Sequence, residues 1–213
     1  MAGCCREQPK FDGMSQAFRQ ALCLVIAING FMFIVEMTAG ALAGSQALKA
    51  DALDFLGDTL TYALSLYVIG MSLRVRAKAA LVKALTLGAM GLWVLGATVY
   101  QALILGVPSV PVMGVVGLVA LGANVVSVLL LMRFRDGDAN VRSVWLCSRN
   151  DAIGNVAVIA AAGGVYFTGS ALPDLVVAAL VAALFLWSAL QILRQACAEL
   201  ALDAEPSPLQ SAS

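Results

Sequence analysis

The sequence predicts an all-α membrane protein with six transmembrane helices and both termini in the cytoplasm. Hydrophobic residues make up 61% of the 213 residues and charged residues only 12%, and the mean hydropathy is +0.90. These values lie far outside the range of soluble domains. The chain also divides into six apolar stretches, each long enough to cross a bilayer as a helix.

Short turns of small or polar residues separate the predicted helices, which cover residues 17–40, 46–72, a run ending near 105, a run ending near 132, 140–167 and 174–198. We expect residues 1–16 to form a cytoplasmic N-terminal tail, 17–200 a six-helix transmembrane domain and 201–213 a disordered tail. The first tail contains the adjacent Cys4 and Cys5, which are either chemically inert or able to capture a soft metal ion.

Basic residues mark one side of the predicted membrane. Cytoplasmic loops carry an excess of lysine and arginine, so these residues should collect in alternate loops. The turns after the first, third and fifth predicted helices contain none. The other connections and ends do: Arg6, Lys10 and Arg19; Arg74, Arg76, Lys78 and Lys83; Arg133, Arg135 and Arg142; and Arg194. This alternation places both termini in the cytoplasm.

Acidic residues interrupt two of the predicted helices. Asp51, Asp54 and Asp58 lie on roughly one side of the second helix, because residues three, four and seven apart share a helix face. Asp151 lies in the fifth helix, which runs in the opposite direction. Ionisable residues within a membrane are costly and usually functional. The two helices should therefore share a functional site.

The positions of these acids suggest one shared depth. Asp58 lies 13 residues after residue 45 and Asp151 nine residues after residue 142, so both should be near the middle of the membrane. Gly57, Ala152 and Gly154 would allow the two helices to approach each other closely.

Four side chains are candidate ligands for a divalent transition metal: Asp54, Asp58, Cys147 and Asp151. Three carboxylates and a thiolate suit four-coordinate binding. Without metal, several carboxylates in apolar surroundings should hold protons, so metal and protons would exchange. Cys147 is either a ligand or a small apolar filler. Asp51 either contacts the metal or is a helix-end residue that pairs with Lys49 or a loop amide.

Three segments resemble the cation diffusion facilitator family: Asn29, Glu36 and Gly40 followed by residues 43–58 (AGSQALKADALDFLGD), residues 148–155 (SRNDAIGN), and residues 173–175 (PDL). The resemblance implies six spans, a homodimer, cytoplasmic termini and divalent metal efflux by proton antiport, with no enzymatic activity. The family's site has a His-or-Asp, three residues, Asp pattern on helices two and five. Here the pattern falls on Asp54 and Asp58, and on position 147 and Asp151.

Two departures from the family refine this expectation. Position 147 is a cysteine where the family usually has histidine or aspartate, and a thiolate favours zinc or cadmium over magnesium or manganese, with cobalt, iron and nickel as further candidates. We also expect a short form that lacks the family's C-terminal cytoplasmic domain. The protein should be a multi-pass protein of the bacterial inner membrane, with the lipid bilayer and a second copy as its partners.

Two other functions remain open from the sequence. An intramembrane aspartyl protease would also need two carboxylates in the membrane, such as Asp58 and Asp151. However, Phe55 and Asn150 stand where the protease motifs have other residues. A membrane scaffold without transport activity would pair the acids with Arg149 and Lys49.

Overall fold

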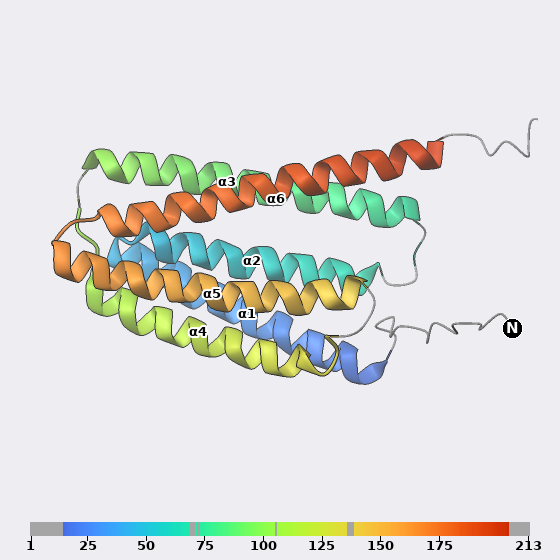
Figure 1. The fold of residues 1–213 in the computed structure, drawn as a ribbon, viewed down its shortest axis with the longest axis horizontal. Helices are drawn as coiled ribbons and strands as arrows, with labels where there is room; N and C mark the ends of the chain where they lie inside the picture. Colours follow the sequence, from blue (N-terminus) through green and yellow to red (C-terminus); the bar gives the residue numbers. More distant parts are fainter. Residues whose placement is uncertain (1–14, 69–70, 72, 105, 136–138, 205–213) are drawn as a thin grey trace, which may run out of the picture.

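A computed structural model describes residues 15–68, 71, 73–104, 106–135 and 139–204; within them, the side chains of 73, 74, 76, 104, 139–147, 199 and 201–204 are not described. This part of the chain forms six helices (Figure 1), which are α1 (Gln16–Ala43), α2 (Gln46–Tyr67), α3 (Leu73–Ile104), α4 (Val110–Met132), α5 (Ala139–Thr168) and α6 (Leu172–Ala204). The described residues confirm the all-α prediction, but α2 ends earlier than expected. The basic residues expected in the connection after it belong to the first turns of α3.

The turn between α1 and α2 is fixed by two residues. Gly44 has a left-handed φ of 69°, which glycine adopts without the steric cost of a side chain, and it ends α1. Ser45 then caps α2, because its hydroxyl accepts a hydrogen bond from the Leu48 amide at 3.1 Å. The acid-bearing helix therefore begins at a defined residue.

The exterior of the bundle is apolar and its interior holds polar residues, as expected for a protein in lipid. Five helices contain a stretch that is long and apolar enough to span a membrane; α2 is the exception among the described helices, and it carries Lys49 and three aspartates. Its 22 residues still extend for about 33 Å, enough to cross the hydrocarbon layer. Phe31, Leu103 and Phe167 are among many large apolar side chains exposed on the surface. The chain is an integral multi-pass membrane protein.

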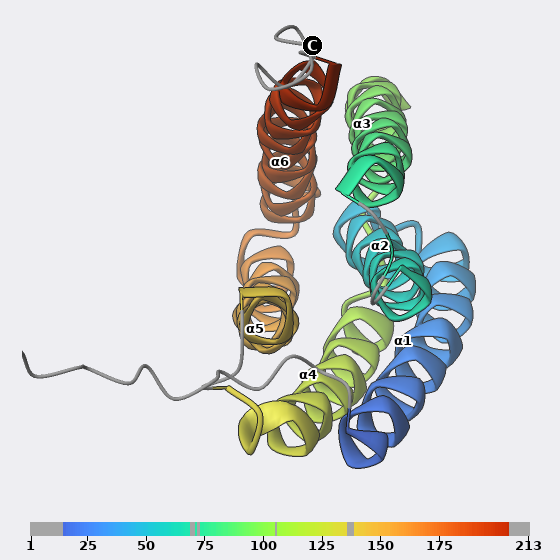
Figure 2. The same ribbon diagram turned by 90° about the vertical axis from the view of Figure 1, so that its right-hand side faces the viewer.

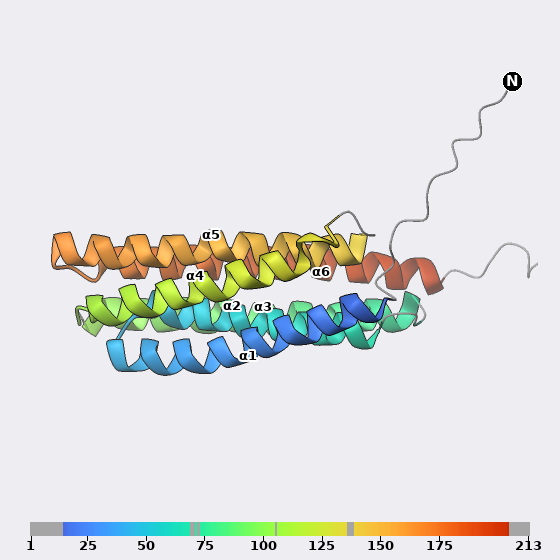
Figure 3. The ribbon, with the colours of Figure 1, turned by 90° about the horizontal axis from the view of Figure 1, so that it is seen from below.

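Helix α2 lies in the middle of the bundle. It packs against α1, α3, α5 and α6, while α3 pairs with α6 and α4 with α5. Figure 2 shows this arrangement end-on, and Figure 3 shows α1 and α5 on opposite sides of it. Gly91 of α3 allows one of the close approaches, since a Cβ there would lie 3.0 Å from Leu186 of α6. The acid-bearing helix is therefore covered by protein on several sides.

Candidate functional site

A cavity of about 630 Å³ lies between α2, α3, α5 and α6. Its lining includes Asp51, Asp54 and Asp58 from α2 and Asp151 from α5. The two helices run in opposite directions (Figure 1). The structure thus brings the three predicted carboxylates, Asp54, Asp58 and Asp151, into one cavity. We refer to these three residues below as the cavity aspartates.

The cavity aspartates are close to one another. The Asp151 carboxyl lies within hydrogen-bonding reach of both Asp54 and Asp58. Asp58 is 12 residues from the first residue of α2 and 9 from the last, so it lies somewhat nearer the C-terminal end than the sequence suggested. Asp151 is 12 residues into the 30-residue helix α5. Both side chains are partly buried within the helical part of the bundle.

Cys147 lies on α5 one turn before Asp151, which is the required position, but its side chain falls outside the described residues. Among the described side chains, no group of three or more histidine, cysteine, aspartate or glutamate residues is arranged to coordinate a metal ion. A bound cation would have to draw the cavity aspartates around one point by side-chain rotation.

Three further polar residues lie in or next to the cavity, and they were not assigned to the site from the sequence. Lys83 of α3 lines the cavity and acts electrostatically on Asp58. Tyr62 is within hydrogen-bonding reach of Asp58, and its hydroxyl lies 3.3 Å from the Ser148 hydroxyl of α5. Helical spacing offered a signal for two of them, because Tyr62 is four residues after Asp58 and Ser148 three before Asp151. Lys83 had been counted only as a loop charge.

The glycines near the acids do not serve the purpose that the sequence suggested. Gly57 faces Leu87 of α3, whose Cδ1 would lie 3.9 Å from an added Cβ, and Gly154 faces nothing within 4 Å. Both residues line the cavity. They leave room for it instead of bringing α2 and α5 into contact.

Asp51 has a different neighbour from the cavity aspartates. Its carboxyl lies within hydrogen-bonding reach of Glu36 on α1. Lys49, the partner considered from sequence, instead acts electrostatically on Asp174. Arg149, which a scaffold would pair with an acid, is exposed and donates a hydrogen bond to Asn150 Oδ1 at 3.4 Å.

Asp174 of α6 holds the start of α2 in place. Its carboxylate accepts hydrogen bonds from the Ser45 hydroxyl at 2.5 Å, the Gln46 amide at 2.8 Å and the Ala47 amide at 3.1 Å. The two amides are donors that the first turn of a helix leaves without intrahelical partners. The carboxylate therefore ties α6 to the N-terminus of the acid-bearing helix.

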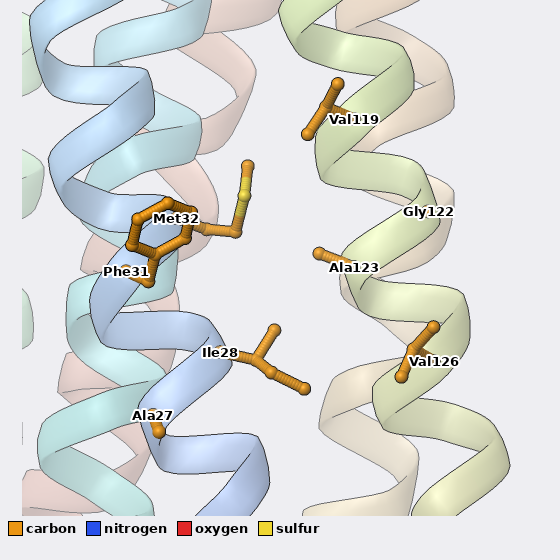
Figure 4. A pocket seen from close by; sticks show the side chains of 8 residues that line it. All are labelled: Ala27, Ile28, Phe31, Met32, Val119, Gly122, Ala123 and Val126. Atoms are coloured by element: carbon orange, nitrogen blue, oxygen red, sulfur yellow. The ribbon is translucent and has the colours of Figure 1, made fainter.

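A second opening lies on the other side of the bundle, between α1 and α4 (Figure 4). It measures about 510 Å³ and is lined only by apolar residues or glycine: Ala27, Ile28, Phe31, Met32, Val119, Gly122, Ala123 and Val126. Its size resembles that of the acidic cavity, but nothing in its lining could hold a cation.

The sequence of the chain is similar to those of known proteins. Residues 22–201 match the family described as the cation efflux transmembrane domain. Over 179 residues the chain is 28% identical to the metal cation efflux system protein CzcD of Cupriavidus metallidurans and 27% identical to the cation efflux system protein CzcD of an Alcaligenes strain. Each alignment covers 76% of this chain and 55% of the relative, so the chain spans about half the length of these curated relatives.

The family match extends over most of the described helices and includes both acid-bearing ones. It excludes the intramembrane protease considered from sequence, because members of this family are transporters and not enzymes. The chain belongs to the cation efflux family, the cation diffusion facilitators that its helix motifs resemble.

Proposed function

We propose that the chain exports a divalent transition-metal cation in exchange for protons. The observation that carries this proposal is the meeting of Asp54, Asp58 and Asp151 in one cavity of a membrane bundle. Carboxylates in such surroundings need either a cation or protons. The names of the bacterial relatives, which refer to metal cation efflux, support the same function.

The charge of the cavity favours a divalent ion. Four carboxyl groups, from Asp51, Asp54, Asp58 and Asp151, line the cavity together with the single Lys83 ammonium, so ionised acids would give the lining several negative charges for a divalent cation to offset. Oxygen ligands together with the Cys147 thiolate favour zinc or cadmium, followed by cobalt, iron or nickel. Asp54, Asp58, Cys147 and Asp151 are the proposed ligands, and protons are the proposed counter-substrate.

The resemblance to the family and its bacterial relatives also supports a setting for this activity. The protein would work as a homodimer in the bacterial inner membrane, with both termini in the cytoplasm. The lysine and arginine pattern supports that orientation, since the basic residues of α3 and of the connection after α4 lie at one end of the bundle (Figure 1).

Metal uptake into proteoliposomes under a pH gradient tests the proposed function. We expect the wild-type protein to accumulate zinc or cadmium while the pH gradient is consumed, and we expect Asp58→Ala to abolish this uptake. Zinc at about 100 times its Kd should raise the free energy of unfolding of the wild type by about 2.7 kcal/mol, and that of Asp58→Ala by nothing measurable.

The control variant is Val119→Leu in the apolar opening, which should transport normally. Wild-type protein that neither takes up any of the five metals nor is stabilised by them would contradict the proposed function. Uptake that is unaffected by Asp58→Ala would contradict the proposed site.

A further inference from the structure

A second pair of carboxyl groups lies beside the cavity, between α1 and α2. Glu36 is fully buried, and only 5% of Asp51 is exposed. The two carboxyls lie within hydrogen-bonding reach of each other. No described donor bonds either carboxylate oxygen of Glu36 or Oδ2 of Asp51. Two acids in this arrangement satisfy each other only if they share a proton.

Helix packing confirms that Glu36 and Asp51 lie at one level. Gly40 of α1 approaches Leu48 and Lys49 of α2, and Met32 packs in one cluster with Phe55. Glu36 is one turn before Gly40 on α1, and Asp51 is about one turn after Leu48 on α2. The two carboxyl groups therefore lie between these two contacts. The pairing therefore follows from the register of two antiparallel helices.

Asn155 of α5 gives independent support for a bound species here. It is fully buried, and neither polar atom of its side chain has a hydrogen-bond partner among the described residues. It shares a helix face with Val158, which packs in one cluster with Leu48 of α2. Asn155 is three residues before Val158 on α5, and Asp51 is three residues after Leu48 on α2. Because the two helices are antiparallel, this spacing places Asn155 at the level of Asp51. The buried amide without a described partner therefore lies at the level of Asp51 on the neighbouring helix.

The Glu36–Asp51 pair lies next to the cavity, but only one of its two residues lines it. Asp51 lines the cavity, whereas Glu36 does not. Asp54 on α2 acts electrostatically on Glu36, and the other charged groups near the pair are Asp151 of α5 and Lys83 of α3, which line the adjacent cavity; α4 contributes none, because its residues 110–132 include no ionisable side chain. A cation held by the cavity aspartates would therefore act on the proton of the pair through Asp51.

We infer that Glu36 and Asp51 form a proton-binding site, separate from the metal ligands, that carries the proton exchanged for the metal. As the cation enters the cavity, its charge disfavours the shared proton, which leaves through the cavity to water. When the cation departs, a proton from the opposite side returns to the pair. This inference rests on the proposed function and adds the residues that bind the counter-substrate.

The test compares proton-driven uptake with metal-for-metal exchange in proteoliposomes, using Glu36→Gln. Exchange of labelled zinc for unlabelled zinc needs no net proton movement. We expect Glu36→Gln to retain this exchange and zinc-induced thermal stabilisation, while uptake driven by the pH gradient falls about tenfold or more. Asp51→Asn should lose pH-driven uptake in the same way. Thr38→Val is the matched control, since Thr38 is exposed on α1 and bonds only its own helix through Ile34.

The shared proton also has a spectroscopic signature. Zinc binding to wild-type protein should reduce the infrared carbonyl absorption of protonated carboxylic acids. The reduction should be smaller in Glu36→Gln, because the cavity aspartates still release their protons but the pair is gone. If Glu36→Gln does not fold, Asp51→Asn takes its place, and a reduction as large as in the wild type overturns the inference.

The outcomes separate this inference from the proposed function. Wild-type protein without any metal uptake refutes the proposed function itself. Normal wild-type transport with unchanged pH-driven uptake by Glu36→Gln overturns the proton site alone. Loss of zinc-induced stabilisation in a folded Glu36→Gln variant also overturns it, because the pair would then belong to the metal site. Uptake that follows a sodium gradient in place of the pH gradient contradicts both, because the proposed function and the proton site each require proton exchange.

Discussion

Asp174 and the cavity aspartates are carboxylates on neighbouring helices of one bundle, but their surroundings differ. Asp174 is 1% exposed, and three donors from the start of α2 satisfy it. Asp54, Asp58 and Asp151 line a cavity, and the close neighbours of Asp151 there include two other carboxyls. The first carboxylate stabilises the fold, whereas the others need a cation or protons from outside the chain.

Burial alone therefore does not identify a functional acid in this protein. A buried carboxylate whose oxygens already accept bonds from backbone amides gains little from a metal. A group of carboxyls that mainly face one another remains available for a cation. The distinction depends on hydrogen-bond partners, and it separates two roles that the sequence alone presents as similar charges in apolar helices.

Replacing Asp174 with alanine should destabilise the fold more than any of the other substitutions. The Ser45 hydroxyl and two amides of α2 would lose their acceptor, and the free energy of unfolding should fall by about 3 kcal/mol. Thermal unfolding in detergent measures this loss. Asp58→Asn is the matched variant, and without metal it should be at least as stable as the wild type. Equal destabilisation by both variants would show that the two kinds of carboxylate do not differ.

Lys83→Met should change the charge of the cavity without removing a carboxylate. The three cavity aspartates would lose a nearby positive charge, so zinc should bind about tenfold more tightly, and its release should slow transport. Zinc titration together with KM and maximal transport rate measures both effects.

Two control variants accompany the Lys83 experiment. Lys83→Arg keeps the charge and should behave like the wild type. Lys78→Met removes an exposed charge of the same helix and should have no effect on zinc affinity. An unchanged zinc affinity in Lys83→Met would show that its ammonium does not contribute to the charge of the site.

Much of this architecture was predictable because membrane burial imposes simple rules. Hydrophobic length predicted the helices, and their alternating direction placed Asp58 and Asp151 at a similar depth. The ends of the helices were less predictable, because an apolar pattern does not distinguish a spanning helix from an apolar connection. Helix α2 ends at Tyr67, five residues before the expected position.

The partners of the acids could not be predicted from spacing on a single helix. The contact between Glu36 and Asp51 depends on the register of α1 against α2, and Lys83 enters the cavity because α3 starts before its basic residues. The role of Asp174 depends on how α6 meets α2. Each of these contacts joins two helices, whereas sequence periodicity describes one helix at a time.

Cys147→Asp should have the smallest effect, because it replaces one anionic ligand with another on the same turn of α5. Three carboxylate ligands would remain, so zinc transport should persist, and the loss of the soft thiolate should reduce the preference for cadmium and zinc over manganese by no more than about tenfold. Competitive uptake of the three metals under one pH gradient measures the preference. An unchanged preference among the three metals would show that Cys147 is not a ligand and that the cavity aspartates determine selectivity. In that case Cys147→Ala should also transport zinc normally.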